Sequence, residues 1–418
     1  MIRTEKIIKP MSKELLSMME SSTLIYNKAL YFIRQAYFKT RDEGKIKTPS
    51  YNELYNLVKV EDCYKNSFLD YCVRQAVIKQ VSDNWNAFIK ATISYNKNPK
   101  KFLGKPKIPS YLKEGKLNVV TIDKSRLRKT NCKEREIRLP KSSYFICLPS
   151  YIDKSSIKCI KVVSFYNKAK ILVCYEKKIE PAVLSYENCI GIDIGVNNLC
   201  SITSNNQQLS WIVNGRIVKS YNQYFNKQKA LIQSELEKCN KRKTSKRLDG
   251  LSKKRNLKIL DYFHNVSRYI IRLCLFHNIG TIIIGYNKGW KQEVPMGKRN
   301  NQTFVSIPFN VLIEQIKYKA EEYGIQVFVT EESYTSKIDH LVLEPMEKRD
   351  IYLGKRICRG LFQSSCGKVL NADINGAIGI LRKQNAIPDV LLENLRDRGD
   401  VVSPMKFPTS ETHKPLSI

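Results

Sequence analysis

The sequence predicts an α/β domain in the second half of the chain, preceded by a part that is first helical and then rich in short strands. Apolar residues recur at helical spacing from Ser12 to about Tyr95. The basic stretch 97–111 contains three prolines, ends that pattern and is followed by short apolar runs typical of strands. Beyond Glu180, strands of the buried type alternate with long helical patterns, as they do in α/β domains.

Net charge is the strongest compositional signal. The 418 residues include 72 Lys and Arg against 39 Asp and Glu, a formal charge of +33. Such an excess repels itself unless a polyanion neutralises it, so nucleic acid is the first partner to consider and an anionic membrane the second. No apolar run approaches the ~18 residues of a spanning helix, and the N-terminal residues contain no signal-peptide core. We therefore expect a nucleic-acid-binding protein of the cytoplasm with no membrane partner.

The 12 cysteines are scattered, and no two of them stand in a Cys-x-x-Cys spacing. In a long chain without a secretion signal, this pattern indicates reduced thiols of a cytosolic protein. We expect most of these cysteines to be small core residues.

The first 180 residues contain a helical segment flanked by strands. Residues 1–10 alternate weakly and stop at Pro10, as a short strand would. Within the helical segment, 68–91 carries an apolar stripe that includes Trp85, and Arg74 and Gln75 lie on its polar side. That side is a candidate for contact with a nucleic-acid backbone, but a plain solvated helix face explains it equally well.

Short β-like runs follow the prolines, at 118–122, 136–139, 145–148, 157–165 and 169–175. Few hairpin signals separate them, so their pairing is not readable from the sequence. The economical arrangement is a small β-barrel that the N-terminal strand also joins, with the helices inserted between its strands.

The second half contains a long helical region from about 216 to 276. Within it, residues 241–258 hold nine Lys or Arg and a single Asp. A solvated helix normally mixes its charges, so we interpret this segment as a nucleic-acid contact in preference to a solubility surface. Its candidate contact residues are Lys241, Arg242, Lys243, Lys246, Arg247, Lys253, Lys254 and Arg255.

One carboxylate, Asp193, stands in an otherwise apolar strand at 189–196. A lone buried charge there would cost several kcal/mol or be forced neutral, and a divalent cation removes that cost. Gly191 and Gly195 would leave space for a metal and a substrate backbone. The competing interpretation is an Asp at the exposed end of the strand, where it caps a turn.

A second carboxylate, Asp373, opens the last predicted helix at 372–384. Alone, it could be an N-terminal dipole partner worth only ~0.3 to 1 kcal/mol. Ala372, Gly376 and Ala377 are small residues on the same side, as needed for a helix pressed closely against a sheet. Two such carboxylates and one more would hold two Mg²⁺ ions about 3.5 to 4 Å apart for attack on a phosphodiester.

Four motifs carry a family resemblance: GIDIGVNN from Gly191, IIIGYNKGWKQ from Ile282, EESYTSK from Glu331 and NADINGAIGILRK from Asn371. In this order and at these separations they resemble the RuvC nuclease domain of TnpB, the transposon-encoded OrfB family. The helix with Trp85 and the following KNPKKFLGKPKIPSY also resemble the N-terminal half of that family. The similarity therefore covers nearly the whole chain.

The resemblance implies an α/β RNase H-like (RuvC) nuclease domain at 181–418, a β-barrel wedge domain at 1–10 and 96–180, and an α-helical recognition domain at 11–95 inserted in the wedge. It implies a guide RNA and target DNA, double-stranded and single-stranded, as partners. The implied activity is RNA-guided cleavage of DNA beside a short transposon-adjacent motif, with one protomer for each RNA favoured. Relatives include type V CRISPR effectors and some nuclease-dead RNA-guided repressors.

In the common family pattern the strand at 281–284 ends in Glu, and Gly285 takes that place here. Either the nuclease is inactive or the Glu is relocated. In an RNase H-like sheet the Gly285 strand lies beside the Asp193 strand, and the strand at 325–330 lies one position further out. Adjacent strands are ~4.8 Å apart, so a Glu on the outer strand reaches across only if the intervening residue has no side chain. Gly285 satisfies that condition.

The outer strand ends in Glu331 and Glu332, and residue alternation sends one to each face. Only one of them can then be a ligand. We prefer Glu332, because some relatives with the same substitution carry a Glu there before Tyr-Thr-Ser, and Glu331 is the alternative. The competing interpretation is that both merely end a strand. The candidate catalytic and metal-binding residues are Asp193, Glu332 and Asp373.

Many relatives carry two Cys-x-x-Cys pairs, and hence a four-sulfur zinc site, in the insert at about 334–370. Here this interval offers Cys358 and Cys366, with His340, which do not make a convincing tetrahedral site. We therefore expect no zinc and an insert that folds by packing alone. Three of its basic residues are expected to face nucleic acid: Lys355, Arg356 and Arg359.

Further candidates for nucleic-acid contact are Lys105 and Lys107 in the proline-rich stretch, and Lys288, Trp290 and Lys291 after Gly285. Trp290 could stack on a base, but burial beneath the loop is the more common fate of a tryptophan.

The favoured interpretation is an RNA-guided, Mg²⁺-dependent DNA endonuclease, with water activated by metal because no histidine lies in a motif. A guided repressor that binds without cutting stays open because of Gly285, and so does a compact type V CRISPR effector. A guide-independent, structure-specific nuclease would leave the basic N-terminal half without a task. The sequence does not reveal the guide or its origin, the recognised DNA motif or the number of protomers.

Overall fold

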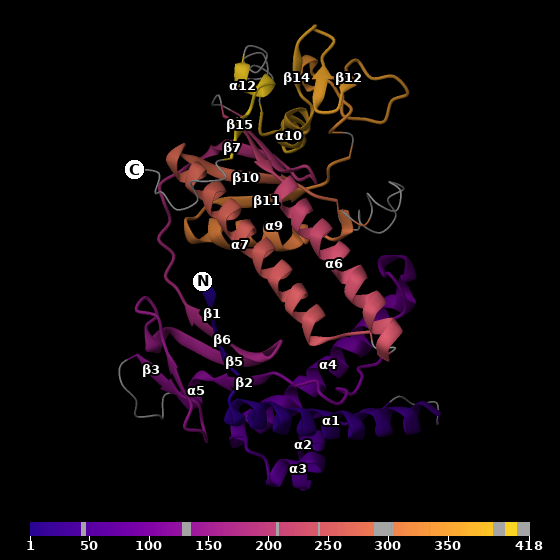
Figure 1. Cartoon of the computed structure of the whole chain (residues 1–418), viewed down its shortest axis with the longest axis vertical. Helices are drawn as coiled ribbons and strands as arrows, with labels where there is room; N and C mark the ends of the chain where they lie inside the picture. Colours follow the sequence, from indigo (N-terminus) through magenta and orange to yellow (C-terminus); the bar gives the residue numbers. More distant parts are fainter. Residues whose placement is uncertain are drawn as a thin grey trace. The chain divides into compact units, whose positions relative to one another are not determined.

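The computed structural model describes residues 1–42, 47–127, 135–205, 209–240, 243–287, 302, 304–333, 335–387 and 398–407. The chain forms two compact units, Met1–Lys178 and Ile179–Ile418 (Figure 1). The finer domain boundaries expected from the sequence stay a prediction. Among the described residues, no helix combines the length and the apolar character needed to cross a bilayer.

Two long helices dominate the helical part of the first unit. Trp85 of α4 is 1% exposed and makes an edge-to-face contact with Tyr37 of α1, with the ring centroids 5.3 Å apart. Ser50 begins α2 with a capping box, in which the Glu53 carboxylate accepts from the Ser50 N–H at 2.7 Å. The helices are α1 Lys13–Asp42, α2 Tyr51–Val58, α3 Asp62–Lys65, α4 Tyr71–Lys97 and the 3₁₀ turn η1 Pro99–Lys101.

The strands of the first unit form a four-stranded antiparallel sheet in the order β1-β6-β5-β2. The N-terminal strand pairs along its whole length with β6, from Ile2 opposite Glu176 to Pro10 opposite Lys168, so it joins the strands of this unit as expected. The barrel itself stays a prediction, because β1 and β2 lie at the two edges of the sheet as described. The elements are β1 Ile2–Pro10, β2 Val120–Asp123, α5 Lys124–Leu127, η2 Lys154–Ser156, β5 Ile157–Phe165, β6 Lys168–Glu176 and the separate hairpin of β3 Glu136–Arg138 and β4 Phe145–Cys147.

A six-stranded sheet forms the centre of the second unit, in the order β11-β10-β7-β8-β9-β15. β10 and β11 run parallel to β7, whereas β8 is antiparallel to both β7 and β9. The expected order around Asp193 is therefore confirmed, with the Gly285 strand between the outer strand and the Asp193 strand. The strands are β7 Ser185–Asp193, β8 Asn198–Ser204, β9 Ser210–Asn214, β10 Ile279–Gly285, β11 Gln326–Thr330 and β15 Met405–Lys406.

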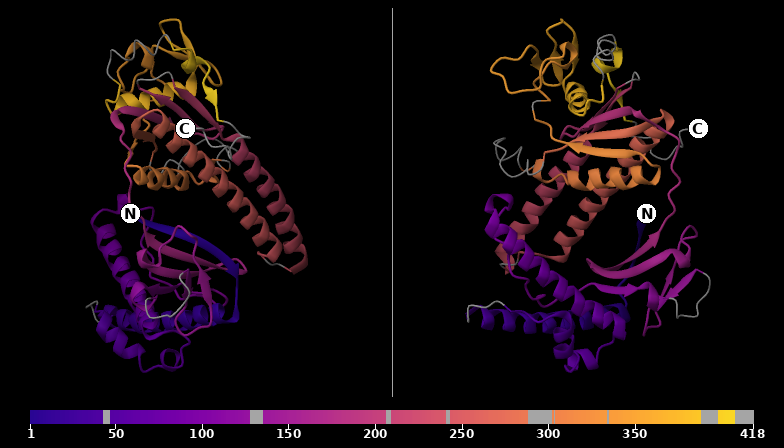
Figure 2. Two further views of the ribbon diagram at one scale, coloured as in Figure 1. Left: turned by 90° about the vertical axis from the view of Figure 1, so that its left-hand side faces the viewer. Right: turned by 180° about the vertical axis from the view of Figure 1, so that it is seen from behind.

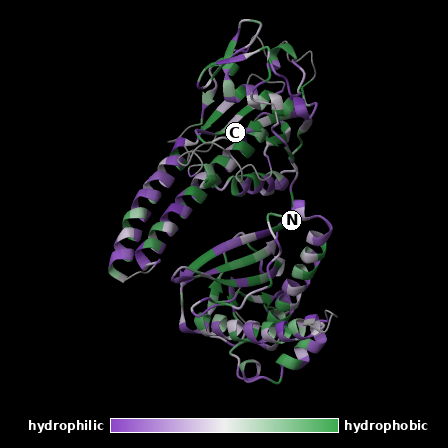
Figure 3. Cartoon of the chain, turned by 90° about the vertical axis from the view of Figure 1, so that its right-hand side faces the viewer, coloured by the Kyte–Doolittle hydropathy of each residue, from purple (hydrophilic) through white to green (hydrophobic). Residues whose placement is uncertain are grey.

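Helices cover both faces of this sheet, with α7 and α9 on one side and α10 on the other (Figures 1 and 2). Successive side chains of a strand point to opposite faces of the sheet, so β10 contributes to the core on each side. Ile282 and Ile284 pack on the first side and Ile283 on the second. The long helical region expected at 216–276 is confirmed and consists of two helices; Ser245 caps the second one by accepting from the Leu248 N–H. Polar residues recur along both of these helices (Figure 3). The helices are α6 Arg216–Asn240, α7 Lys246–Phe276, α9 Phe309–Glu322, α10 Ala372–Lys383 and α12 Gly399–Val402.

Buried polar groups, as well as apolar packing, hold the insert together, which corrects the expectation of packing alone. Asp339 is fully buried, and its carboxylate accepts from the Ser364 hydroxyl at 2.8 Å and from the Ser365 N–H at 2.7 Å. Glu344, 1% exposed, accepts from the N–H groups of Asp339 and Leu353. These bonds satisfy two buried carboxylates that would otherwise be costly. The insert contains the 3₁₀ turn η3 His340–Val342 and a sheet of β12 Lys355–Cys358, β13 Leu361–Gln363 and β14 Val369–Asn371.

The cysteines correct another expectation, because only a minority of those described belong to the core. Cys189, Cys200 and Cys274 are buried. The others described are half-buried or exposed, Cys358 and Cys366 of the insert among the exposed ones. Cys132 lies outside the described residues.

His340 uses one ring nitrogen within the insert and the other to join the insert to α10. It is fully buried, its Nε2–H donates to the Thr335 carbonyl at 2.8 Å, and its Nδ1 accepts from the Arg382 guanidinium at 2.9 Å. Burial is the main cause that lowers the pKa of His340 from 6.5 to about 4, and the Arg382 charge adds to it. The imidazole is therefore neutral in the folded protein.

Acidification is expected to destabilise the protein through His340. The unfolded chain takes up a proton on this residue near pH 6.5 and the folded chain only near pH 4, so the stabilisation is complete above pH 6.5 and is lost as the pH falls towards 4. We expect a loss of about 2 kcal/mol between pH 7 and pH 5 from this residue. Thermal unfolding of the wild type and of His340→Gln, whose amide can keep both hydrogen bonds, measures it. The variant should lose less stability on acidification, and equal losses in both proteins would contradict the assignment.

Candidate metal centre

Asp193 is the last residue of β7, at the centre of the six-stranded sheet. Its carboxylate lies against α10 at Gly376, where an added Cβ would come within 2.7 Å of the Asp193 Oδ2. Burial, with the nearby Asp373 charge as the second cause, raises the pKa of Asp193 to about 7. The surroundings of the Asp193 carboxylate therefore provide too little positive charge to offset its burial.

Two glycines near Asp193 in the chain allow close packing against neighbouring segments. An added Cβ on Gly191 would meet the Ala377 carbonyl and the Leu381 side chain, and one on Gly195 would lie 2.7 Å from the Asn198 carbonyl. The space beside Gly191 and Gly195 is thus filled by the protein itself, which corrects the expectation that these two glycines leave room for a metal and a substrate. Gly191 permits helix packing and Gly195 permits the turn into β8.

Asp373 lies in the first turn of α10, which Asn371 caps by accepting from the N–H groups of Asp373 and Ile374. The Asp373 carboxylate accepts a hydrogen bond of 2.6 Å from the Asn198 amide. The Arg356 guanidinium of the insert lies 3.8 Å from its other oxygen. Two neighbours from distant parts of the sequence therefore orient this carboxylate.

Glu332 extends across Gly285 towards Asp193. A Cβ placed on Gly285 would lie 2.6 Å from the Glu332 Cγ and 2.8 Å from its Oε1, closer than any real Cβ contact. Gly285 pairs with Thr330, two residues before Glu332, so the glutamate leaves the outer strand just beyond the glycine. The space that the missing side chain leaves on β10 is occupied by the side chains of Glu332 and of Ile380 from α10, whose Cδ1 lies nearest.

Glu332 is also electrostatically strained. Its Oε1 is buried and has no hydrogen-bond partner among the described residues. Burial first, and the Asp193 charge second, raise the pKa of Glu332 to about 8. Its backbone N–H is held by the Asn287 side chain, which accepts at 2.8 Å.

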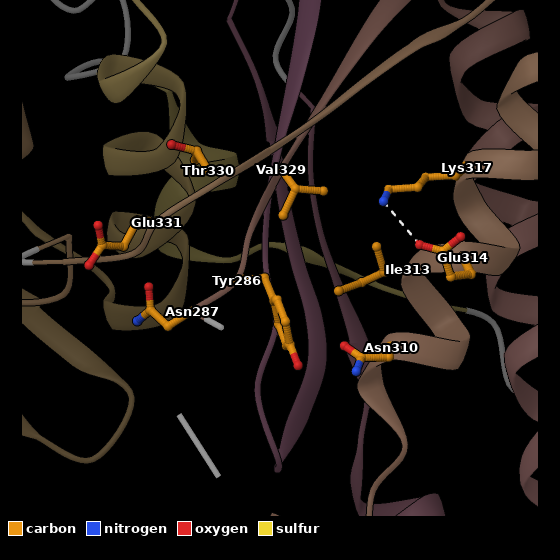
Figure 4. Close-up of a pocket in the computed structure, with 9 residues that line it drawn as sticks. All are labelled: Tyr286, Asn287, Asn310, Ile313, Glu314, Lys317, Val329, Thr330 and Glu331. Carbon is orange, nitrogen blue, oxygen red and sulfur yellow. Dashed lines mark hydrogen bonds and ion pairs between the residues drawn. The ribbon is translucent and has the colours of Figure 1, made fainter. Parts of the chain in front are cut away.

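Glu331 lies on the opposite face of the strand from Glu332. It is exposed and lines a cavity with Tyr286, Asn287 and Asn310, as Figure 4 shows. Alternation therefore separates the two glutamates, as the sequence predicts, and Glu332 is the one that lies with Asp193.

Divalent metal fits the donor set of this site. Asp193 interacts electrostatically with Glu332 on one side and with Asp373 on the other. An unpartnered buried oxygen and two carboxylates with raised pKa are what oxygen-preferring cations compensate. Within the described residues, no three His, Cys, Asp or Glu side chains converge on one point as ligands of a single ion would. The arrangement is instead two carboxylate pairs that share Asp193.

The three candidate zinc ligands of the insert differ in burial and in hydrogen bonding. Both nitrogens of His340 are hydrogen-bonded inside the protein. Cys358 and Cys366 are exposed, and the Cys366 sulfur lies 3.1 Å from the Ser364 hydroxyl.

The predicted nucleic-acid contacts divide into three groups. Arg74, Gln75 and Arg255 make internal contacts: Arg74 donates to the Tyr64 carbonyl, Gln75 to the Tyr71 hydroxyl, and Arg255 to the Asn222 side chain and the Ser306 carbonyl. The polar groups of these three residues support the fold, and their contact with nucleic acid stays a prediction. Lys253 is half-buried, and the exposed candidates are Lys105, Lys107, Lys243, Lys246, Arg247, Lys254, Lys355, Arg356 and Arg359. Lys241, Arg242, Lys288, Trp290 and Lys291 lie outside the described residues.

Sequence reasoning missed three residues of the centre. Asn198 orients Asp373, Asn287 holds the Glu332 backbone, and Lys383 of α10 donates to the Glu331 carbonyl at 2.9 Å. Asn198 and Lys383 end two of the recognised motifs and Asn287 lies within a third, so the motifs contained the signal without assigning a role to it.

Comparisons with known proteins agree with this geometry. The OrfB_IS605 family, described as a probable transposase, matches residues 172–291, and the TNB domain of Cas12f1-like proteins matches residues 309–380. The TnpB-like protein ORF457 of Acidianus two-tailed virus is 27% identical over 226 residues. That match covers 52% of this chain and 46% of the viral protein, so the chain matches about half the length of this relative.

Among solved structures, the Cas12f1 chain from its complex with sgRNA and target DNA superimposes with a TM-score of 0.54 at 13% identity. The match covers 88% of this chain and 82% of the Cas12f1 chain. The shared fold supports the RuvC architecture expected from the sequence. The chain is therefore similar in parts of its sequence to OrfB_IS605 and Cas12f1-like proteins and to a TnpB-like protein, and similar in fold to Cas12f1.

Proposed function

We propose that the protein is an RNA-guided DNA endonuclease of the TnpB type, which cleaves target DNA beside a short recognised motif. One observation carries the proposal: the Glu332 carboxylate occupies the place left by the missing side chain of Gly285 and lies with Asp193. Without nuclease function, nothing would favour the presence of three carboxylates together with a glycine that makes room for one of them.

Asp193, Glu332 and Asp373 would hold two Mg²⁺ ions, with Asp193 shared between the pairs. The ions would activate water and neutralise charge on the scissile phosphate when bound. The protein side chains keep the ligands in place: Asn198 fixes Asp373 and Asn287 fixes the backbone of Glu332. Arg356 lies beside Asp373, where its guanidinium can meet a phosphate oxygen.

His340 takes no part in this proposed chemistry. It is fully buried, neutral and hydrogen-bonded through both nitrogens. We assign the activation of water to the metal ions that the three carboxylates would hold.

Guide RNA would supply sequence specificity by base pairing, and the protein would hold the heteroduplex through its backbone. The formal charge of +33 and the exposed basic residues of α7 and the insert support this partner. The related Cas12f1 was solved with an sgRNA and target DNA. We propose one protomer for each guide RNA.

In the direct test, the RNA that co-purifies with the protein is sequenced. Its sequence is then used to design DNA targets. Cleavage of a matched target in Mg²⁺, absent with a mismatched target, is the expected result. Guide-dependent binding without cleavage would instead make the protein an RNA-guided repressor. If the RNA is encoded in a CRISPR array, the protein would belong to the compact type V effectors.

The two adjacent glutamates provide a matched pair of variants. Glu332→Gln removes a ligand and is expected to reduce the cleavage rate at least about 100-fold, whereas Glu331→Gln should retain most of it because Glu331 points to the other face. Rates are measured under single-turnover conditions with excess enzyme and RNA. Equal losses in both variants would contradict the assignment of Glu332.

Gly285→Ala tests the space that Glu332 occupies. The new methyl group would meet both the Ile380 and the Glu332 side chains, so both must shift, and a shift of about 1 Å at a catalytic group costs roughly 100-fold in rate. Gly399→Ala is the control, because an added Cβ there meets nothing within 4 Å.

The double variant Gly285→Glu with Glu332→Ala sharpens this test. It returns the carboxylate to the inner strand and should cleave faster than Gly285→Ala. A Gly285→Ala protein as active as the wild type would show that Glu332 does not need the gap.

A further inference from the structure

A cavity of about 720 Å³ lies at the carboxyl ends of β10 and β11, on the face of the sheet that α9 covers. Its volume is within the range of small-molecule and cofactor sites. Figure 4 shows the Tyr286 ring and the Val329 and Ile313 side chains around it, with Asn287 and Asn310 at its edge. The metal centre does not use this cavity, because Glu332 points to the opposite face.

The walls of the cavity combine flat apolar surface with amide groups. Tyr286 offers an aromatic face, and Ile313 and Val329 offer aliphatic contact; Val329 is 41% exposed. Asn287 and Asn310 each carry a donor and an acceptor that can reach the edge of a planar ring. Aromatic stacking with amides at the ring edge is how proteins bind unpaired nucleobases.

The charges of the cavity favour a neutral ligand over a phosphate. Lys317 is paired with Glu314 at 3.0 Å, and Figure 4 marks this ion pair. Glu331 adds a negative charge on the opposite side of the cavity. With two carboxylates against one ammonium group among its lining residues, the cavity disfavours an anion and suits an uncharged heterocycle.

One hydrogen bond links the cavity to the metal centre: Asn287, which lines the cavity, accepts from the N–H of Glu332 at 2.8 Å. A second one, from the Tyr286 N–H to the Thr330 carbonyl at 2.8 Å, joins the two chain segments of the cavity wall. Tyr286 directly follows Gly285 in the chain, and Glu331 directly precedes Glu332. The cavity therefore adjoins the candidate metal centre at the carboxyl ends of these strands.

We propose that the cavity binds one unpaired nucleobase of the DNA strand being cut, adjacent to the scissile phosphate. The proposal rests on the proposed nuclease function and names a part of its substrate site. Stacking on Tyr286 would hold the base and thereby fix the position of the phosphate over Asp193 and Glu332.

Abasic scanning of the cut strand tests the proposal. Targets that lack one base at successive positions around the cut are cleaved by the complex of full-length protein and RNA. We expect one position at which the missing base slows wild-type cleavage about tenfold, within the range for loss of a stacked base. The Tyr286→Leu protein should cut the intact target at a similarly reduced rate, and the abasic site should not slow it further. The Tyr286→Phe protein, which keeps the ring, should behave as the wild type.

A second measurement does not depend on cutting. The cleavage-deficient Asp193→Asn protein with its RNA binds DNA that carries the fluorescent base 2-aminopurine at the same positions, with Tyr286 or with Leu at that residue. Quenching at one position that Tyr286→Leu relieves supports the cavity. A flat abasic profile together with position-independent fluorescence overturns it. Absence of cutting in the wild type with position-specific quenching would refute the nuclease function and retain the base-binding cavity.

Discussion

The metal centre depends on one packing relation, the Glu332 side chain lying in the space above Gly285. Strand spacing places the outer strand too far from Asp193 for a carboxylate to pass over any ordinary residue of β10. An added Cβ at Gly285 would lie 2.6 Å from Glu332. The carboxylate near Asp193 therefore comes from the outer strand and passes over a residue without a side chain. Burial first, and neighbouring negative charge second, raise the pKa values of Asp193 and Glu332.

One helix connects this centre to the insert. Along α10, Asp373 contributes a carboxylate, Gly376 makes room for Asp193, and Gly379 makes room for His340. Lys383, at the end of the helix, donates to the Glu331 carbonyl and to the Ser333 hydroxyl. Small residues at this spacing let the helix approach the sheet and the insert together, so a larger residue at either glycine would disturb more than one neighbour.

The family resemblance predicted the strand order around Asp193 and brought Asp193, Glu332 and Asp373 into one hypothesis. Residue alternation, which is a local pattern, separated Glu332 from Glu331. Contacts between distant residues were not predictable in this way. Asn198 lies 175 residues before Asp373, and the Arg74 and Arg255 side chains turn out to donate to internal acceptors. A polar residue on a helix gives the same pattern whether it faces solvent, nucleic acid or a carbonyl within the fold.

A buried carboxylate joins separated turns of the insert. The Asp339 carboxylate receives hydrogen bonds from Ser364 and Ser365, about 25 residues further along the chain, and hydrogen bonds to charged groups contribute about 1.5 to 3 kcal/mol each. This buried carboxylate thus ties η3 to the residues after β13. Because β12 pairs with β13, the same network fixes the strand that carries Arg356 beside Asp373. The polar core of the insert therefore contributes to the geometry of the metal centre itself.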